Sequence, residues 1–502
     1  MRWIGLFLCA AVGLFLCAAV FSAWGQSTSA SQQAERAREL VASGKPEQAV
    51  PIYEELLKVS PDNAALLANL AVALYEAGRY ADVIEQCQKA LSLRPDLTTA
   101  WLFLGAAYFK TGDPGRAVEP FEKVLQARPT ERNANLMMAE ALLRLERYDE
   151  AAEGFLAASK LLPGEPRVWY GLERACDAVS RRAAEELDAS TPDSVYGYLL
   201  AGDSAFRLGR YALAVHHYRQ ALAAPSEMRE GLASLARVYE ASGHADWAHQ
   251  VEQRLERLPR LDCESAALEC SFQAGRYEEL LRLSASPVSP ESSFWRAKAC
   301  GKLAEEALSR LSQLPESAQL HELEAGRRDE QGIYREAVRH WRQALQLAPK
   351  DAELQRGLAL SLYNSGDFEQ ALPILKELLA EQPDSAEVNY LVGSSLLLSE
   401  EPRKAIPHLE RALKSDPEFL RARGALGNAL LQLGSFEEAI PHLAAALAID
   451  EDGRIHYQLV RAYQGAGREE AARQTLEQYR QVQQSAEARR RALEGISAIT
   501  PP

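Results

Sequence analysis

The sequence predicts an all-α protein built as a solenoid of stacked helical hairpins, and three observations support this class. Small residues recur in steps of 34, at Ala117 and Ala151 and again at Ala337, Ala371, Ala405 and Ala439. Prolines keep the same step, at Pro61, Pro95, Pro129 and Pro163 and again at Pro349, Pro383 and Pro417. The chain is also rich in Ala, Leu, Glu and Arg and has no sustained alternation of apolar and polar residues. A fixed period of roughly 20–50 residues indicates a repeat array in which each unit packs on its neighbours.

The block from Thr98 to Glu131 contains one complete unit. Its first helix is predicted from an apolar face at helical spacing, made of Trp101, Leu104, Gly105 and Tyr108. A cluster around Gly112 predicts a tight turn. The second helix carries the apolar stripe Ala117, Phe121 and Val124 and ends at Pro129, which has no N–H to continue the helix. Because Gly105 and Ala117 are small, we expect the two helices to approach closely.

This unit resembles the tetratricopeptide (TPR) repeat at seven positions, namely Trp101, Leu104, Gly105, Tyr108, Ala117, Phe121 and Pro129. The resemblance implies a right-handed α-α superhelix, a TPR solenoid of about 12–14 helical hairpins. It also implies that the first helix of each unit lines the concave face of the solenoid, with positions 2, 5, 9, 12 and 13 of the unit pointing into it.

The repeats occur in two blocks with a different phase. The first block has the units 30–63, 64–97, 98–131 and 132–165, and the second has 318–351, 352–385, 386–419, 420–452 and 453–486. Between the blocks, 195–228 matches the repeat well and 229–260 matches it less closely. The segments 166–194, 261–287 and 292–317 are degenerate. We therefore predict two arms, an N-terminal TPR array over 30–283 and a C-terminal TPR array over 292–486. A Ser/Pro linker over 284–291 would join them, and 487–502 would form a C-terminal tail.

The N-terminus predicts export. Arg2 precedes an uncharged, largely apolar run from Trp3 to Trp24, in which the segment 5–12 is repeated identically as 13–20. Residues 1–25 are therefore either a signal peptide or an N-terminal anchor. Ala23 and Gly25 fit a cleavage site before Gln26, whereas the doubled segment is about long enough to cross a bilayer. Both alternatives place the array in the periplasm, in the cell envelope or outside the cell, and the membrane is contacted only through residues 3–24 if they are retained.

The cysteines do not form a disulfide framework, because five remain after Gln26 and they are widely spread. Cys87 occupies the slot that Phe121 fills in the next unit, so we expect a buried thiol. Cys263 and Cys270 are seven residues apart on one predicted helix, too far along its axis to bridge each other. Cys270 with Cys300 is the candidate disulfide, because both lie mid-helix in adjacent degenerate units.

Catalytic chemistry has no support in the sequence. His321 and Glu322 begin like a zinc-protease helix, but Ala325 stands where the second histidine ligand is needed. We therefore predict no enzyme activity, no cofactor and no metal. The net charge of −14, without a Lys/Arg stripe, argues against nucleic acid as a partner.

The candidate partner-binding residues follow from the positions that the resemblance assigns to the concave face. In the first block they are apolar: Tyr75, Leu102, Phe109, Leu136 and Leu143, with Phe103 and Met137 beside them. An amphipathic helix or an extended apolar peptide would suit them, and packing between units is the alternative. In the second block they are Arg356, Tyr363, Tyr390, Leu397, Arg421, Leu431, Tyr457 and Arg461. Tyr and Arg are enriched at binding hot spots, and an ordinary amphipathic surface is the alternative.

These observations predict a non-catalytic scaffold or adaptor that binds unidentified protein or peptide partners. The alternative is an accessory subunit of an envelope assembly or export machine, which works only within a complex. The clamp that binds chaperone C-termini in some TPR domains is not expected, because Asn69 fits one of its positions while Thr99 and Phe103 occupy others.

Overall fold

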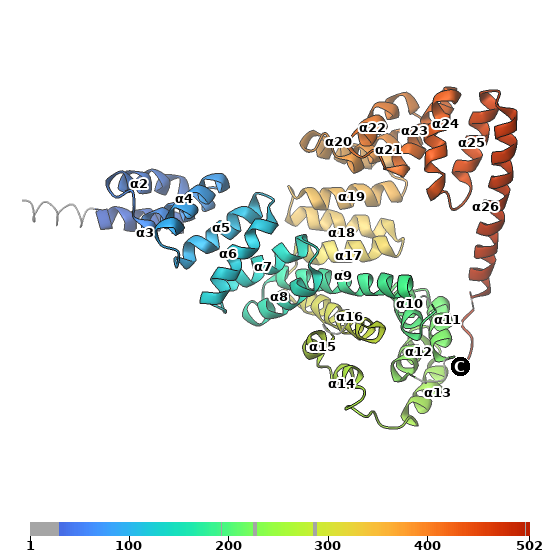
Figure 1. Ribbon diagram of the computed structural model, residues 1–502, viewed down its shortest axis with the longest axis horizontal. Helices are drawn as coiled ribbons and strands as arrows, with labels where there is room; N and C mark the ends of the chain where they lie inside the picture. Colours follow the sequence, from blue (N-terminus) through green and yellow to red (C-terminus); the bar gives the residue numbers. More distant parts are fainter. Residues whose placement is uncertain (1–29, 192, 224–227, 285–288, 497) are drawn as a thin grey trace, which may run out of the picture. The chain divides into compact units, whose positions relative to one another are not determined.

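The computed structural model describes residues 30–191, 193–223, 228–284, 289–496 and 498–502. In these residues all regular secondary structure is helical, and the helices follow one another as antiparallel hairpins (Figure 1). The predicted all-α solenoid is confirmed. Contacts divide the chain into a first unit of 1–179 with 303–307 and a second unit of 180–302 with 308–502. The predicted two arms, with a boundary at 284–291, stay a prediction.

The first unit begins with a helix over 30–42. It continues with α2 (Pro46–Val59), α3 (Ala64–Glu76), α4 (Tyr80–Leu93), α5 (Thr98–Lys110), α6 (Pro114–Ala127), α7 (Arg132–Arg144), α8 (Tyr148–Leu161) and the first part of α9 (Pro166–Ser190).

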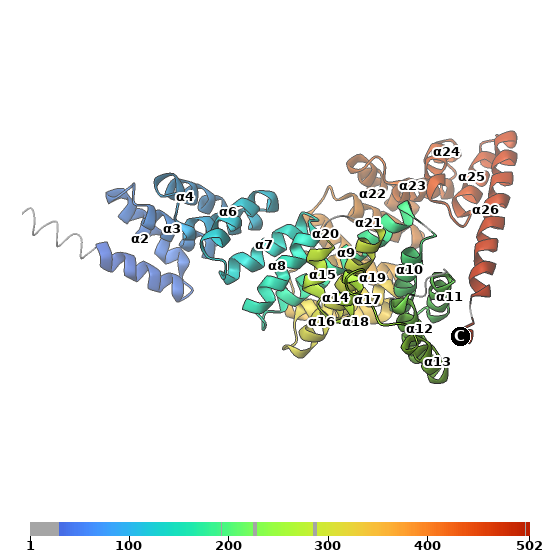
Figure 2. The ribbon, with the colours of Figure 1, turned by 60° about the horizontal axis from the view of Figure 1, so that its bottom comes forward.

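The second unit contains two runs of hairpins (Figure 2). The first run is α10 (Val195–Arg207), α11 (Tyr211–Leu222), α12 (Arg229–Ala241), α13 (Ala245–Glu256), α14 (Ala267–Gln273), α15 (Tyr277–Leu283) and α16 (Pro290–Gln313), of which residues 303–307 belong to the first unit. The second run is α17 (Ala318–Glu330), α18 (Tyr334–Leu347), α19 (Ala352–Asn364), α20 (Phe368–Glu381), α21 (Ala386–Leu398), α22 (Pro402–Ser415), α23 (Leu420–Gln432), α24 (Phe436–Ala445), the 3-10 turn η1 (Ala446–Ile449), α25 (Arg454–Gly465) and α26 (Glu469–Gly495).

Small residues let the two helices of a hairpin meet, as the sequence predicts. Ala117 and Phe121 of α6 are fully buried against α5. A Cβ atom added to Gly105 would lie 2.8 Å from the Phe121 ring, so only glycine fits between the two helices without a shift of the ring. The Cys87 thiol is also fully buried, as predicted, and its burial raises its pKa to about 12.

The turn inside each hairpin requires a left-handed residue at the fifteenth position of the unit. Gly112 occupies this position with φ of 82° and Gly366 with φ of 82°. Glycine adopts this conformation without steric cost because it has no Cβ. Two units depart from the rule, since Glu146 and Glu400 take the same position with φ of 58° and 63°.

The expectation about the disulfide is wrong. The structure joins Cys263 to Cys270, with 5.7 Å between their Cα atoms, and Cys300 is a buried free thiol. The error lies in the helix boundary: α14 begins only at Ala267, and Cys263 lies in the turn before it. The chain therefore folds back onto the helix, and the helical rise that was expected to separate the two cysteines is absent.

Several sequence expectations fall on the chain ends and on the Ser/Pro segment. The signal peptide or anchor over 1–25 and residues 285–288 of the linker lie outside the described residues. Ser289 begins α16 with a capping box, in which its hydroxyl accepts from Ser292 N–H and its N–H donates to the Ser292 hydroxyl. Residues 487–495 of the expected tail continue α26. None of the helices that the structure describes is both long and apolar enough to span a membrane.

Candidate functional site

The candidate site residues of the first unit form the N-terminal face: Tyr75, Leu102, Phe103, Phe109, Leu136, Met137 and Leu143. Tyr75 is half-buried, and its ring centre lies 5.3 Å from that of Phe103 in an edge-on arrangement. Leu102, Met137 and Leu143 are likewise partly exposed. Phe109 and Leu136 are only 4% and 3% exposed, so they pack inside the unit and contribute little open surface.

A charged pair lies beside the aromatic residues of the N-terminal face. The guanidinium of Arg167 on α9 donates two hydrogen bonds to the Glu140 carboxylate on α7, at 2.9 and 2.6 Å. Both groups are close enough to Tyr75 to affect its pKa, which is raised mainly by burial of the hydroxyl. Arg144 lies over the Phe109 ring, 4.1 Å from its centre. The face therefore presents apolar rings next to an ion pair that already satisfies its own charges.

The C-terminal face contains the other predicted residues: Arg356, Tyr363, Tyr390, Arg421, Tyr457 and Arg461, with Leu397 and Leu431. The structure brings Tyr363, Tyr390 and Arg421 of this set together around Ser394. The hydroxyls of Tyr363 and Ser394 are 2.7 Å apart, and the Tyr390 ring centre lies 5.0 Å from that of Phe419. Burial raises the pKa of Tyr390 to about 12, with a further contribution from Tyr363. Leu397 and Leu431 are buried.

The arginines of the C-terminal face differ in their partners. Arg356 pairs with Glu353 at 3.3 Å. Arg421 and Arg461 are exposed, and neither has an ion-pair partner within the described residues. Tyr457, one helical turn before Arg461 on α25, is 51% exposed, and its ring centre lies 5.8 Å from that of Tyr479 on α26. The face therefore carries two positive charges that are not paired within the described residues, one near Tyr390 and one a helical turn from the exposed Tyr457 ring.

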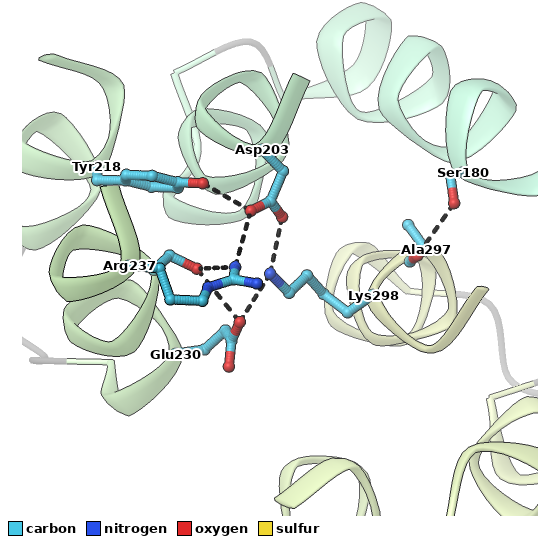
Figure 3. A network of polar contacts seen from close by, with 8 residues as sticks. Ser180, Asp203, Tyr218, Glu230, Arg237, Ala297 and Lys298 are labelled. Carbon is cyan, nitrogen blue, oxygen red and sulfur yellow. Dashed lines mark hydrogen bonds and ion pairs between the residues drawn. The ribbon is translucent and has the colours of Figure 1, made fainter. Parts of the chain in front are cut away.

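A third set of polar side chains, which the sequence reasoning missed, forms the middle face of α10 and α12 (Figure 3). It consists of Tyr196, Asp203, Glu230 and Arg237. Asp203 and Arg237 are the ninth residues of their units, and Tyr196 and Glu230 are the second, so all four hold positions that the TPR resemblance assigns to ligand binding.

Helix α16 of the same chain covers the middle face. The Lys298 ammonium group lies 2.8 Å from the Asp203 carboxylate and 2.7 Å from that of Glu230 (Figure 3). Arg237 lies 3.7 Å from Asp203, which also accepts a hydrogen bond from the Tyr218 hydroxyl at 2.7 Å. The ring centres of Tyr196 and Phe294 on α16 are 5.2 Å apart. Phe294 and Lys298 of α16, four residues apart, thus fill the place on the middle face that a bound ligand would take.

The electrostatics of the middle face follow from this pairing. Burial alone would lower the pKa of Lys298, which is only 7% exposed, but the carboxylates of Asp203 and Glu230 outweigh burial and raise it. Burial would raise the pKa of Asp203, but Lys298, with Tyr218 and Arg237, lowers it below its usual range. The lysine and this carboxylate therefore both stay charged at neutral pH.

The sequence shows the charges of this pairing but not that they meet. Asp203 and Glu230 are carboxylates at positions expected to face a ligand, and Lys298 is one of three cations, with Arg296 and Lys302, in a short stretch of a degenerate unit. Their complementarity does not follow from the repeat period, because the period describes only contacts between neighbouring units.

No group of three or more His, Cys, Asp or Glu side chains converges as metal ligands would within the described residues. His321, the residue that begins the zinc-protease-like string, is buried and bonds Glu316 at 2.7 Å. The neighbouring Ala325 is fully buried in the packing of its hairpin.

Comparisons with known proteins agree with the repeat assignment. Two family models, both described as tetratricopeptide repeat, match the chain at three places each. One matches 35–98, 199–259 and 390–454, and the other matches 108–175, 330–394 and 430–494. No curated protein matches the chain.

Among solved structures, several of MamA are similar to parts of the chain. A MamA structure labelled MSR-1 is 23% identical and covers 34% of this chain and 98% of its own, with a TM-score of 0.30. MamA of Desulfovibrio magneticus RS-1, from residue 41 to its end, is 23% identical and covers 34% of this chain and 96% of its own, with a TM-score of 0.31. The assignment to a family rests on the repeats and their helices.

Proposed function

The chain belongs to the tetratricopeptide-repeat family, and from this premise we propose that it is a non-catalytic scaffold that binds protein partners through its N-terminal and C-terminal faces. The middle face is already covered by α16, so of the three faces described above the N-terminal and C-terminal ones offer side chains for a partner. The observation that carries the proposal is the C-terminal face, where exposed Arg421 and Arg461 have no ion-pair partner among the described residues. Arg421 lies close to Tyr390, and Arg461 lies one turn from exposed Tyr457 on α25. Arg and Tyr provide most of the binding energy in many protein interfaces.

The two faces favour partners of different chemistry. The N-terminal face presents Tyr75, Phe103 and Leu102 next to a satisfied ion pair, so we propose that it takes an apolar segment. The C-terminal face presents uncompensated guanidinium groups on a chain with net charge −14. Positive charges on an otherwise acidic protein attract a carboxylate-bearing segment selectively, and Arg binds carboxylates with two parallel hydrogen bonds.

We also propose that the protein acts outside the cytoplasm, in the periplasm or cell envelope or as a secreted protein. The apolar run from Trp3 to Trp24 supports export. The Cys263–Cys270 disulfide supports an oxidising compartment, where such bonds form and persist.

The second candidate function is an accessory subunit of an envelope assembly or export machine, favoured by the same export signal. A pull-down with residues 26–502 on an envelope extract distinguishes the two roles. One stable complex of fixed stoichiometry supports the subunit, whereas several weakly held ligands support the adaptor. If no partner is retained from any fraction, the binding function itself is contradicted.

A further inference from the structure

The last residues of the chain return to the first hairpins of the second unit. The Arg219 guanidinium on α11 donates to the Thr500 hydroxyl at 2.6 Å and to the Thr500 carbonyl at 3.3 Å. The Tyr239 hydroxyl on α12 donates to the same carbonyl at 2.8 Å. Both views place the C-terminus beside α11 and α13 (Figures 1 and 2). Three hydrogen bonds thus join residues that are 281 and 261 positions apart in the sequence.

The first unit contains the same pair of positions, and none of the residues that the structure describes forms a docked tail there. There Gln88 on α4 donates to the Tyr108 hydroxyl on α5 at 3.1 Å, and the two residues are 20 positions apart. Arg219 donates to the Tyr239 hydroxyl at 3.3 Å across the same separation of 20. The amide of Gln88 has two N–H bonds, whereas a guanidinium has five, so Arg219 keeps donors for a second acceptor beyond the tyrosine.

The Thr500 carbonyl is well suited to be that acceptor. Pro501 and Pro502 have no N–H groups, and a proline keeps the residue before it extended. The segment therefore cannot satisfy its own carbonyls by forming a turn of helix, and donors must come from elsewhere.

The Tyr239 side chain, whose hydroxyl donates to the Thr500 carbonyl, is fixed by the packing around its ring. Its ring is fully buried, and its centre lies 5.6 Å from that of Trp247 in an edge-on arrangement. Trp247 in turn stacks on His244, with 4.3 Å between the ring centres. Burial raises the pKa of the Tyr239 hydroxyl against the opposing effect of Arg219, so the hydroxyl keeps its proton and donates it at neutral pH.

We propose that Arg219 and Tyr239 form a peptide-binding site for an extended Thr-Pro segment, and that residues 498–502 of the same chain are its resident ligand. The site goes beyond the proposed function, because it lies on neither the N-terminal nor the C-terminal face. Its occupation ties the end of α26 to α11 and α12. Release of the tail would free the site for a second segment of the same chemistry.

The test uses the full chain with a fluorophore attached after Pro502, and its readout is the anisotropy of the fluorophore. In the wild-type chain the docked tail restricts the label. Arg219→Gln, which recreates the natural pair of Gln88 and Tyr108, and Tyr239→Phe are expected to lower the anisotropy towards that of a free tail. Tyr108→Phe is the matched control, since it removes the equivalent hydroxyl in a hairpin without a tail, and it should leave the anisotropy unchanged.

A second measurement determines the chemistry of the ligand. A labelled peptide of residues 496–502 should bind a chain that ends at Gly495, and Arg219→Gln should weaken this binding about tenfold or more. Replacement of Thr500 by Val in the peptide should also weaken it, because the hydroxyl acceptor is lost.

The proposal is overturned if the wild-type and Arg219→Gln chains give equal anisotropy, or if the peptide binds both truncated chains equally. The proposal is also overturned if the anisotropy difference between the wild-type and Arg219→Gln chains grows with protein concentration. In that case the bound tail would come from a second copy of the chain.

Discussion

Lys298 shows how one residue can link elements that the repeat period does not connect. It is buried between two carboxylates on α10 and α12, although it belongs to α16 and lies 95 residues after Asp203. Removal of one partner from a buried ion pair is costly because a charge is left without compensation. The residue thus holds α16 over the middle face.

We expect Lys298→Met to lower the free energy of unfolding of the second unit by about 3–5 kcal/mol, because buried Glu230 and half-buried Asp203 lose their cation. Denaturant unfolding followed by circular dichroism measures this. The triple variant Lys298→Met, Asp203→Asn, Glu230→Gln is the control and should recover much of the loss, since it also removes the two charges. A loss below about 1 kcal/mol in the single variant would mean that the network does not hold α16.

The same network predicts a dependence of stability on pH. The pKa of Asp203 is lower in the folded chain than its ordinary value of about 3.9. Its contribution is therefore fully present above that ordinary value and is lost as the pH falls through the lower, folded-state value. We expect the stability advantage of the wild type over Asp203→Asn to be constant near neutral pH and to shrink below about pH 4. An advantage that stays constant into the acid range would contradict the assignment.

At the scale of the hairpin, the sequence predicts the structure well where the argument depends on neighbouring positions. The stripe from Trp101 to Tyr108, the turn at Gly112 and the close contact of Gly105 with Phe121 all follow from one period. The prediction fails where an element departs from the period. The late start of α14 at Ala267 places Cys263 in a turn, and only the three-dimensional path of that turn brings it to Cys270.

The left-handed turn position allows a test at this scale. Glu400 adopts φ of 63° where most units have glycine. Its backbone is strained there, because the left-handed conformation brings Cβ close to the following carbonyl oxygen. We expect Glu400→Gly to raise the free energy of unfolding by about 0.5–1 kcal/mol, because relief of about 1–2 kcal/mol of left-handed strain exceeds the entropy cost of glycine, about 0.5–1 kcal/mol. Gly366→Ala, at the same position of the preceding unit, is the opposite control and should cost about 1 kcal/mol. Equal midpoints for Glu400→Gly and the wild type in thermal unfolding would show that this turn is not strained.

At the scale of the whole molecule, the repeat period determines the class of protein but not which faces are open. The sequence indicates which side chains belong to the N-terminal and C-terminal faces. It did not indicate that α16 covers the middle face or that Thr500 binds Arg219, because both contacts join residues far apart in the chain. Such contacts depend on how successive hairpins stack, which a local pattern does not describe.

The central claim is that the chain binds a partner through the C-terminal face, and its most direct test is the affinity of the captured partner for matched charge-reversal variants. Arg421→Glu and Arg461→Glu introduce repulsion on the face, whereas Arg411→Glu changes an exposed arginine on the second helix of a hairpin, α22. Isothermal titration should show a loss of about tenfold or more for each of the first two variants and little change for the third. Equal affinity of all three variants and the wild type would contradict the account.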